Sequence, residues 1–260
     1  MLLSQRIAFI GAGNMASALI EGLLAAGTCK ADGIVASDVR PEALAILAKR
    51  YAIHTTTDNA VAVQGAQVVV LSTKPQSFAE LLPSLATRID PATLVISIAA
   101  GVPLSVIESQ FGTGLRAVRA MPNTPALVQA GATAISAGRL ATPADLDVAE
   151  AIFASVGVVE RVPEALLDAV TGLSGSGPAY VFLMIEALTN AGIQTGLSPK
   201  TAAVLAAQTV FGAAKMERQT GESPEALRRK VTSPGGTTAA GLASLDARDF
   251  TGIVAQAVAA

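Results

Sequence analysis

The chain has 260 residues, of which 51% are hydrophobic, 15% charged and 3% aromatic, and its net charge is −2 at pH 7. This length accommodates two domains of ordinary size, and the composition predicts a large core built mainly from aliphatic side chains. The nearly neutral charge provides no basic patch, which argues against a nucleic-acid partner. Because so apolar a chain carries so little charge, we expect another subunit to cover some of its helix faces.

One cysteine, Cys29, and one histidine, His54, occur in the chain. A single residue of each kind excludes an intramolecular disulfide and leaves no cysteine-based or multi-histidine metal site. We therefore expect no metal, and structural roles for both residues, with Cys29 buried or half-buried. The longest uncharged segments, such as residues 91–107, contain prolines and glycines, which is not typical of membrane-spanning helices. We expect a soluble cytoplasmic protein that does not bind membranes.

Up to about residue 160, short β-branched runs alternate with segments of helical spacing. Val68–Leu71 is apolar at every position, which is typical of a strand buried on both faces of a parallel sheet. The fold class is predicted as α/β, with an N-terminal Rossmann-type, mostly parallel sheet and helices on both faces, in a dinucleotide-binding domain over residues 1–162. Strands are predicted at 7–10, 33–37, 67–71, 93–98, 115–120, 132–136 and 158–162, and helices at 14–26, 41–49, 59–64, 77–85, 104–111 and 143–155. Residues 51–57 fit a short strand or a loop.

Two helix starts have clear signals. Thr142 precedes Pro143 and is followed by acidic residues in the first turn, which is typical of a capped helix. Ser198 precedes Pro199 in the same way. From residue 163 onwards the strand signal is absent, and an all-α domain is predicted over residues 163–260, with helices at 180–191, 201–216, 224–230, 238–245 and 248–259. The helix at 201–216 is apolar on most sides, which predicts burial on most sides.

The segment from Ile7 to Ala16 predicts a strand, a glycine turn and a helix start. Gly11 allows the tight turn, Gly13 lets a pyrophosphate approach the backbone, and Ala16 is small enough to pack the helix on the strand. Asn14 and Met15 begin the helix at this turn. Because the pattern follows a strand and opens a series of strand–helix units, it predicts dinucleotide binding.

The end of the second predicted strand should select the nucleotide. An acidic residue there usually binds the ribose diol of NAD, whereas a serine with an arginine suits the 2′-phosphate of NADP. This chain has Ser37, Asp38 and Arg40 together, and Asn59 adds an amide for the same ribose. Arg40 fits a phosphate or adenine contact and a solvated charge equally well. We expect NADPH to be the cofactor, with NADH also accepted.

Small and polar residues follow three further strands. The carboxyl ends of strands in such a sheet line the cofactor crevice, so we expect one cleft there rather than ordinary loops. Lys74 fits a cofactor-side cation or a solvated charge. The residues at these strand ends are Ser72, Thr73, Lys74 and Pro75, then Ala99, Ala100 and Gly101, and finally Asn123.

Two segments of the helical half contain clustered glycines and hydroxyls. Residues 232–242 read Thr-Ser-Pro-Gly-Gly-Thr-Thr-Ala-Ala-Gly-Leu, and the proline and glycines interrupt any helix. This segment fits an anion pocket at a helix N-terminus, and it fits a capped connector between helices equally well. Residues 171–180 carry three glycines and two serines before a long helix, which fits a functional turn or a flexible connection.

Taken together, these motifs resemble the pyrroline-5-carboxylate reductase family. The resemblance covers nearly the whole chain through residues 11–15, 74–75, 99–101, 121–125, 172–180 and 233–238. The last two motifs are specific to the family, whereas the first occurs in many dehydrogenases. The resemblance implies reduction of the cyclic imine 1-pyrroline-5-carboxylate to L-proline with NADPH or NADH, the last step of proline biosynthesis. It also implies a helical substrate-binding and dimerisation domain, in a homodimer or a ring of five dimers.

The resemblance also implies roles for individual residues. Backbone N–H groups of Gly235, Gly236, Thr237 and Thr238 would hold the substrate carboxylate. The Thr238 hydroxyl would lie near the ring nitrogen and donate or relay a proton, and Ser233 would support the loop. Ser176 and Gly177 would border the substrate pocket. Because the loop lies in the helical half, we expect it to reach the cofactor of a partner subunit.

One residue departs from the family pattern, and two rival functions are left open. A glutamate that supports the loop in the family is matched here only by Glu222, one residue out of place. A related hydroxyacid or imine reductase is a rival, but hydroxyacid enzymes of this kind usually need a lysine on the helix at 180–191, which has none. A nucleotide-binding redox sensor is a second rival, and it would not need the loop at 233–238.

Overall fold

The computed structural model describes residues 5–111 and 114–260. The chain divides into two compact units, the first ending at Gly175 and the second spanning Ser176–Ala260. The last strand ends at Arg161, near the predicted change to all-α structure. The first unit then continues through η5 (Glu164–Leu166), α7 (Leu167–Val170) and the π-helical turn η6 (Thr171–Gly175). Secondary structure and packing therefore give different boundaries, about a dozen residues apart.

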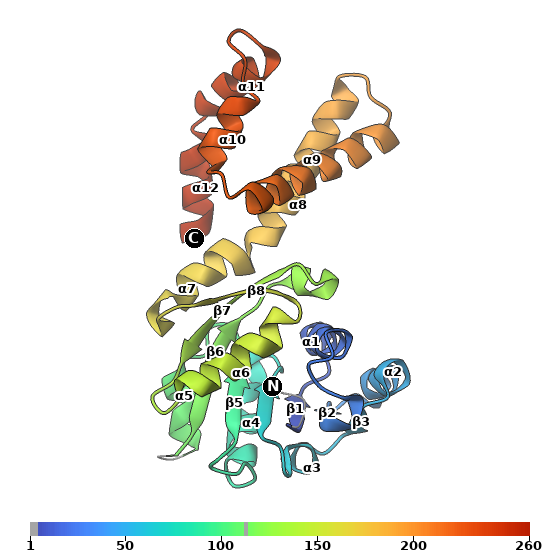
Figure 1. The fold of residues 1–260 in the computed structure, drawn as a ribbon, viewed down its shortest axis with the longest axis vertical. Helices are drawn as coiled ribbons and strands as arrows, with labels where there is room; N and C mark the ends of the chain where they lie inside the picture. The colour runs from blue at the N-terminus through green and yellow to red at the C-terminus, as the bar shows by residue number, and fades with distance from the viewer. Residues whose placement is uncertain (1–4, 112–113) are drawn as a thin grey trace. The chain divides into compact units, whose positions relative to one another are not determined.

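The described part of the first unit contains one sheet of eight strands in the order β3-β2-β1-β4-β5-β6-β7-β8 (Figure 1). Neighbouring strands are parallel except β6 and β7, which are antiparallel. The order from β3 to β6 is that of a doubly wound dinucleotide-binding sheet, as predicted. The strands are β1 (Ile7–Ile10), β2 (Ile34–Ser37), β3 (His54–Thr56), β4 (Val68–Leu71), β5 (Leu94–Ser97), β6 (Arg116–Met121), β7 (Gly131–Ala137) and β8 (Gly157–Arg161).

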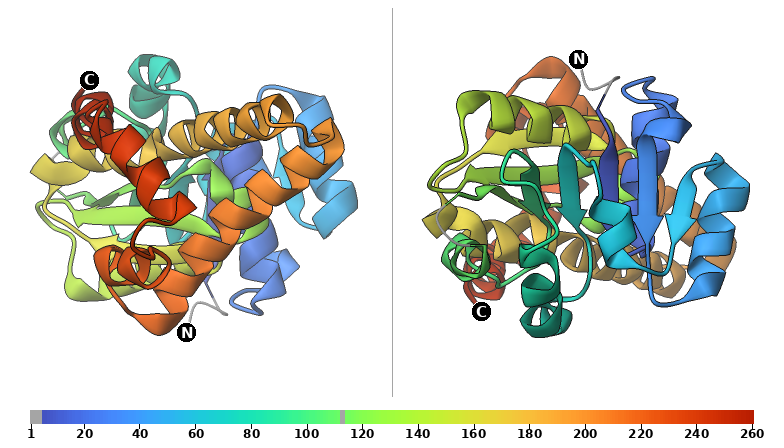
Figure 2. Two further views of the ribbon diagram at one scale, coloured as in Figure 1. Left: turned by 90° about the horizontal axis from the view of Figure 1, so that it is seen from above. Right: turned by 90° about the horizontal axis from the view of Figure 1, so that it is seen from below.

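Helices cover both faces of this sheet, and each strand sends alternate side chains into two cores. Ile7 and Phe9 belong to the core under α1 (Asn14–Ala25), α2 (Pro41–Tyr51) and α6 (Pro143–Ala154). Ala8 and Ile10 belong to the core under α3 (Asn59–Val63), α4 (Phe78–Ala86) and α5 (Leu104–Gln110). Figure 2 shows the strands side by side in its right-hand view. Burial on both faces explains why β1, β2, β4 and β5 are apolar at nearly every position.

Local sequence signals account for several element boundaries. The Thr142 hydroxyl accepts a hydrogen bond from the Asp145 N–H at 3.3 Å, and Asp145 Oδ2 accepts one from the Thr142 N–H at 2.8 Å. This reciprocal capping box fixes the start of α6. The segment around His54 is a strand, β3, at the sheet edge. Its side chains are only partly covered, which explains its weak pattern. Cys29 is buried.

The short connections are 3₁₀ turns that the sequence pattern did not reveal. They lie where the chain leaves or enters a strand, and each has only three to five residues. They are η2 (Ala31–Gly33), η3 (Pro75–Ser77), η4 (Thr124–Val128) and η5 (Glu164–Leu166). Turns of this length leave no periodicity to detect.

The second unit is entirely helical, as predicted. Its helices are α8 (Gly177–Gln194), α9 (Pro199–Thr220), α10 (Pro224–Lys230), α11 (Thr237–Asp246) and α12 (Phe250–Ala259). The α8 and α9 helices form a hairpin (Figures 1 and 2). Ser198 caps α9 by accepting a hydrogen bond from the Thr201 N–H at 3.2 Å. No helix in the described residues is long and apolar enough to cross a membrane.

Burial in the second unit differs from the prediction. Within this fully described unit, Ala202 and Ala206 on α9 are the buried hydrophobic residues, although α9 was expected to be buried on most sides. Large apolar side chains remain exposed on α8 and α9, including Phe182 at 64%, Leu183 at 66% and Phe211 at 60%. In a single chain, the apolar faces of these helices are therefore in contact with solvent.

Candidate functional site

The turn between β1 and α1 requires glycine. Gly11 has a φ of +103°, and a Cβ at this position would lie 2.8 Å from the Ser72 carbonyl oxygen. The Gly11 N–H donates to the Ser37 carbonyl at 2.7 Å, and the Ser72 hydroxyl donates to the Gly11 carbonyl at 2.8 Å. The turn therefore holds the ends of β1, β2 and β4 together. Gly13 faces open space, with no heavy atom within 4 Å of an added Cβ.

The N-terminus of α1 faces the same turn. Gly13 is its N-cap residue, no side chain caps it, and its first turn contains no acidic residue. Its first N–H groups, beginning at Asn14 and Met15, are therefore available to an anion, and the helix dipole favours negative charge there. Ala16 is fully buried against the sheet, as the motif predicts.

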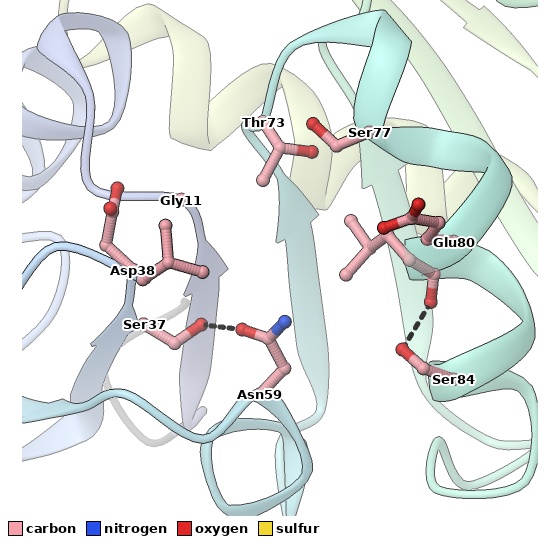
Figure 3. Close-up of a pocket in the computed structure, with 10 residues that line it drawn as sticks. Gly11, Ser37, Asp38, Asn59, Thr73, Ser77, Glu80 and Ser84 are labelled. Atoms are coloured by element: carbon pink, nitrogen blue, oxygen red, sulfur yellow. Dashed lines mark hydrogen bonds between the residues drawn. The ribbon is translucent and has the colours of Figure 1, made fainter.

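A cavity of about 350 Å³ opens where the strand order reverses, between the carboxyl ends of β1 and β4 (Figure 3). The ends of β1 and β2 supply one wall through Gly11, Ser37 and Asp38, together with Asn59 at the start of α3, and Thr73 with α4 supplies the other. This is the position at which doubly wound sheets bind their ligands. The lining residues are Gly11, Ser37, Asp38, Val39, Asn59, Thr73, Ser77, Glu80, Leu81 and Ser84.

Asp38 is the most heavily hydrogen-bonded residue of this cavity. Its Oδ2 accepts from the Ala12 N–H at 2.9 Å, and its Oδ1 accepts from the Arg40 N–H at 2.9 Å. The Arg40 guanidinium also donates to both oxygens, at 3.0 and 3.1 Å. Burial raises the pKa of the Asp38 carboxyl, but the hydrogen bonds and charge of Arg40 and the hydrogen bond from Ala12 outweigh it, so the pKa lies below its ordinary value. The carboxylate is therefore ionised at neutral pH.

The residues beside Asp38 are already partly engaged. Ser37 is fully buried, and its hydroxyl donates to Asn59 Oδ1 at 2.7 Å (Figure 3). Asn59 therefore turns its amide NH₂, which has no partner among the described residues, toward other acceptors. The Arg40 side chain is 62% exposed and paired with Asp38, and it does not line the cavity. The structure thus brings Ser37 and Asn59 to the cavity and leaves Arg40 at its rim.

Thr73 provides a direct indication of a missing partner. Its Oγ1 atom is buried and has no hydrogen-bond partner among the described residues, and Thr73 lines the cavity. An unpartnered buried hydroxyl is costly unless a ligand satisfies it. With the open face of Gly13 and the uncapped helix start, these residues fit a dinucleotide.

The α4 helix divides the predicted cleft into two cavities. Ser77, Glu80, Leu81 and Ser84, spaced as one helix face, line the first cavity. The opposite face lines a second cavity of about 450 Å³, together with Pro75 and Gly101. Of the predicted strand-end residues, Thr73 therefore faces the first cavity and Pro75 and Gly101 the second. The other five, Ser72, Lys74, Ala99, Ala100 and Asn123, line neither.

The sequence prediction missed Val39 and the α4 face. The 77–80–81–84 spacing could have indicated the α4 face, but it gives no indication of Val39. Val39 is 84% exposed and lines the first cavity, so it offers an apolar surface to a ligand. Asp38 was noted only as a factor in the choice of nucleotide.

Asn123, a predicted cofactor-binding residue, has both polar side-chain atoms engaged within the first unit. Its amide donates to the Ser174 carbonyl at 3.0 Å, and its Oδ1 accepts from the Ala132 N–H at 2.8 Å. It thus links the end of β6, the start of β7 and the π-helical turn. Gly175 completes this packing, since a Cβ there would lie 2.6 Å from Met121 Cε.

In the second unit, residues 233–236 form a tight turn before α11. The Gly236 N–H donates to the Ser233 carbonyl at 3.1 Å, and Gly235 has a φ of +70°, which favours glycine. No side chain caps α11, so the N–H groups of Thr237 and Thr238 lack acceptors among the described residues. The turn therefore presents free donors at a helix N-terminus, but the Gly236 N–H is not one of them.

The side chains around this turn are open to solvent. Ser233, Thr237 and Thr238 are exposed. Among the described residues, the Glu222 side chain forms no hydrogen bond with the turn. Its carboxylate accepts from Lys230 Nζ at 2.7 and 2.5 Å, which holds it at the end of α10, just before the turn. Ser176 and Gly177 lie at the start of α8 and are half-buried.

Comparisons with known proteins cover both units. Residues 164–260 match a family model described as pyrroline-5-carboxylate reductase dimerisation, and residues 6–101 match one described as NADP oxidoreductase, coenzyme F420-dependent. The chain is 49% identical to a pyrroline-5-carboxylate reductase of Methanosarcina acetivorans, over 94% of this chain and 90% of that one. It is 46% identical to one of Pseudomonas aeruginosa, over 98% and 93%.

Solved structures agree. A pyrroline-5-carboxylate reductase of Coxiella burnetii has a TM-score of 0.94 and 39% identity, covering 98% of this chain and 95% of that one. A pyrroline carboxylate reductase of Plasmodium falciparum with NADP bound has a TM-score of 0.86 and 30% identity, covering 98% and 94%.

Proposed function

The chain belongs to the pyrroline-5-carboxylate reductase family, and on that premise we propose that it reduces 1-pyrroline-5-carboxylate to L-proline with NADPH, the last step of proline biosynthesis. The observation that carries this proposal is that the likeness extends through both units. The dinucleotide-binding unit alone would fit many dehydrogenases. The match of residues 164–260 to the family's dimerisation model supports this family's substrate over those of other dehydrogenases.

The first unit would bind the cofactor, which supplies a hydride to the imine carbon when bound. The Gly11–Gly13 turn and the N–H groups of Asn14 and Met15 receive the pyrophosphate. The buried Thr73 hydroxyl and the free amide of Asn59 serve as donors to the ribose. The remaining proposed cofactor contacts are Ser37, Arg40, Ser72, Lys74, Pro75, Ala99, Ala100 and Gly101. Asn123, whose polar side-chain atoms already bond within the first unit, is assigned a structural role. We propose NADPH as the preferred cofactor, with NADH also accepted.

The turn before α11 would hold the substrate carboxylate. The free N–H groups of Thr237 and Thr238, at the positive end of the helix dipole, provide charge-assisted hydrogen bonds to a carboxylate. Because the Gly236 N–H already bonds to Ser233, we assign Gly235 and Gly236 to the shape of the turn, which Ser233 supports. Ser176 and Gly177 would line the same pocket.

The reaction also needs a proton on the imine nitrogen, because the hydride adds to the neighbouring carbon. The Thr238 hydroxyl is exposed and has no hydrogen-bond partner among the described residues. We propose that this hydroxyl either donates a hydrogen bond to the imine nitrogen or relays a proton from water to it. Because a threonine hydroxyl is a weak acid, we assign it the role of positioning the proton and not of being its source.

The helical unit would assemble at least a homodimer. The exposed apolar side chains of α8 and α9, among them Phe182, Leu183 and Phe211, form a surface that a second copy would cover. A ring of five dimers and a cytoplasmic location remain proposals that follow from the family resemblance. Sedimentation at micromolar concentration tests the dimer, and a stable monomer would contradict it.

The activity is tested by mixing the full-length protein with 1-pyrroline-5-carboxylate and following the oxidation of NADPH or NADH by its loss of absorbance. We expect turnover with this imine and none with small 2-oxo acids, which NADPH would reduce to 2-hydroxy acids, because α8 has no lysine to serve hydroxyacid chemistry. Turnover of the acids alone would favour the rival enzyme class. Binding of NADPH without turnover of any substrate would favour a sensor.

A further inference from the structure

We propose that Asp38 is a specificity-determining residue that competes with the cofactor's 2′-phosphate for Arg40 and so limits discrimination between NADPH and NADH. The inference rests on the proposed function, because it concerns the adenosine end of the same cofactor site. It deepens that function by assigning the selectivity to one carboxylate.

The geometry shows how completely Asp38 occupies Arg40. The guanidinium donates to both carboxylate oxygens, through Nε at 3.0 Å and Nη2 at 3.1 Å. This two-point contact is the arrangement that arginine also uses for phosphate. A 2′-phosphate can therefore recruit Arg40 in the same manner only if the guanidinium leaves Asp38 or shares its donors between the two anions.

The second carboxylate contact keeps Asp38 in place during such an exchange. Its Oδ2 accepts from the Ala12 N–H, in the glycine turn, at 2.9 Å. The carboxylate side chain is 9% exposed, whereas that of Arg40 is 62% exposed. Arg40 is thus the mobile member of the pair and Asp38 the fixed one. When Arg40 turns to a phosphate, the fixed carboxylate loses its cation and faces the phosphate.

The charge of the cavity adds to this competition. Among the described residues that line it are two carboxylates, Asp38 and Glu80, and no lysine, arginine or histidine. Figure 3 shows the two on opposite walls. A neutral ribose 2′-hydroxyl can donate a hydrogen bond to Asp38 and leaves the Asp38–Arg40 pair intact. A 2′-phosphate gains Arg40 only by drawing it away from Asp38, and the phosphate then lies near an unpaired carboxylate, so the 2′-phosphate has one favourable and one unfavourable feature in this site.

The experiment measures binding of NADPH and of NADH by fluorescence titration of the full-length protein, without substrate. Asp38→Asn keeps an oxygen that can accept from the Ala12 N–H but removes the charge that holds Arg40. We expect the ratio of the NADH to the NADPH dissociation constant to rise about ten- to a hundredfold, the value of one or two charge-assisted hydrogen bonds. Thermal unfolding checks that the variant is folded.

Asp58→Asn is the matched control. Asp58 also precedes a helix at this sheet edge, and its carboxylate accepts from the Ala60 N–H at 2.8 Å without contacting an arginine. The Asp58→Asn substitution removes one negative charge, as Asp38→Asn does, and asparagine caps a helix as well as aspartate does. We expect its ratio to change less than about threefold, the general electrostatic effect of one exposed charge.

Arg40→Gln completes a double-mutant cycle. Alone it should weaken NADPH binding and leave NADH binding nearly unchanged. If Asp38 acts mainly through Arg40, Asp38→Asn should change the ratio much less in the Arg40→Gln background than in the wild type, because only the direct effect of the carboxylate on the ribose hydroxyl or the phosphate then remains.

If Asp38→Asn and Asp58→Asn have the same ratio of NADH to NADPH dissociation constants, and each variant still binds either cofactor, this inference is overturned and the proposed function stands. An undiminished Asp38→Asn effect without Arg40 would also overturn it. Failure of the wild-type chain to bind either cofactor would overturn both.

Discussion

Replacing Gly11 with alanine tests the structural basis of the cofactor site most directly. Gly11 has a φ of +103°, and an added Cβ would lie 2.8 Å from the Ser72 carbonyl oxygen and 3.0 Å from the Thr73 nitrogen. Alanine in a positive-φ conformation costs about 1–2 kcal/mol. Because the neighbouring atoms are backbone, β1 and β4 must also move apart, which costs about 1–3 kcal/mol more. We expect Gly11→Ala to destabilise the protein by about 2–5 kcal/mol in total.

The cofactor should also bind more weakly. An added Cβ would displace the backbone of Ser72 and Thr73, and Thr73 lines the cavity and carries the unpartnered hydroxyl. Gly27→Ala is the matched control, since Gly27 has a φ of +62° but no heavy atom within 4 Å of an added Cβ. Gly27→Ala should lower the free energy of unfolding only by the cost of alanine at positive φ, about 1–2 kcal/mol, and leave the affinity for NADPH unchanged.

The two variants are compared by thermal unfolding and by NADPH fluorescence titration. For a chain of this size, a difference of about 2 kcal/mol corresponds to roughly 4–8 °C in the unfolding midpoint. If Gly11→Ala unfolds at the same temperature as Gly27→Ala and binds NADPH equally well, the close packing of β1 against β4 does not shape the site, and the reasoning fails.

Three further changes test other parts of the molecule. Thr238→Ala should lower kcat about a hundredfold without weakening NADPH binding, and Thr238→Ser should restore most of it; an unchanged kcat would remove this hydroxyl from the mechanism. Asn123→Ala strands two backbone groups and should cost about 1–3 kcal/mol of unfolding free energy with cofactor affinity retained, whereas loss of affinity without loss of stability would make Asn123 a cofactor ligand. Burial, with hydrogen bonding and charge from Glu21, raises the pKa of Tyr51 to about 12, above its unfolded value of about 10. Its contribution to stability should be complete below about pH 10 and disappear as the pH rises toward 12, so Tyr51→Phe should flatten the stability curve in that window, and an unaltered curve would contradict this.

The sequence predicted the layered fold well because its signals are local. Apolar strands, the glycine turn and the Thr142–Asp145 cap each depend on a few neighbouring residues. Edge strand β3 has only three residues and partly exposed side chains, so its pattern could not separate strand from loop.

The candidate site was harder to predict, because its features depend on which atoms meet in space. The pairing of Asp38 with Ala12 joins residues 26 positions apart, and no spacing rule reveals it. The division of the expected cleft by α4 follows from the position of a helix whose two faces both line cavities. Asn123 fits a ligand role in sequence, but only its partners in space show that its amide is already engaged.

The sparse burial within the second unit has a consequence for how this protein's stability should be defined. A helical unit whose buried hydrophobic residues are two alanines gains little free energy from its own packing. If a second copy supplies the missing contacts, then folding of this unit is a bimolecular event, and its midpoint shifts with protein concentration. Dilution would then loosen the 233–236 turn before it disturbs the cofactor cavity, so specific activity should decline at low enzyme concentration while NADPH binding persists.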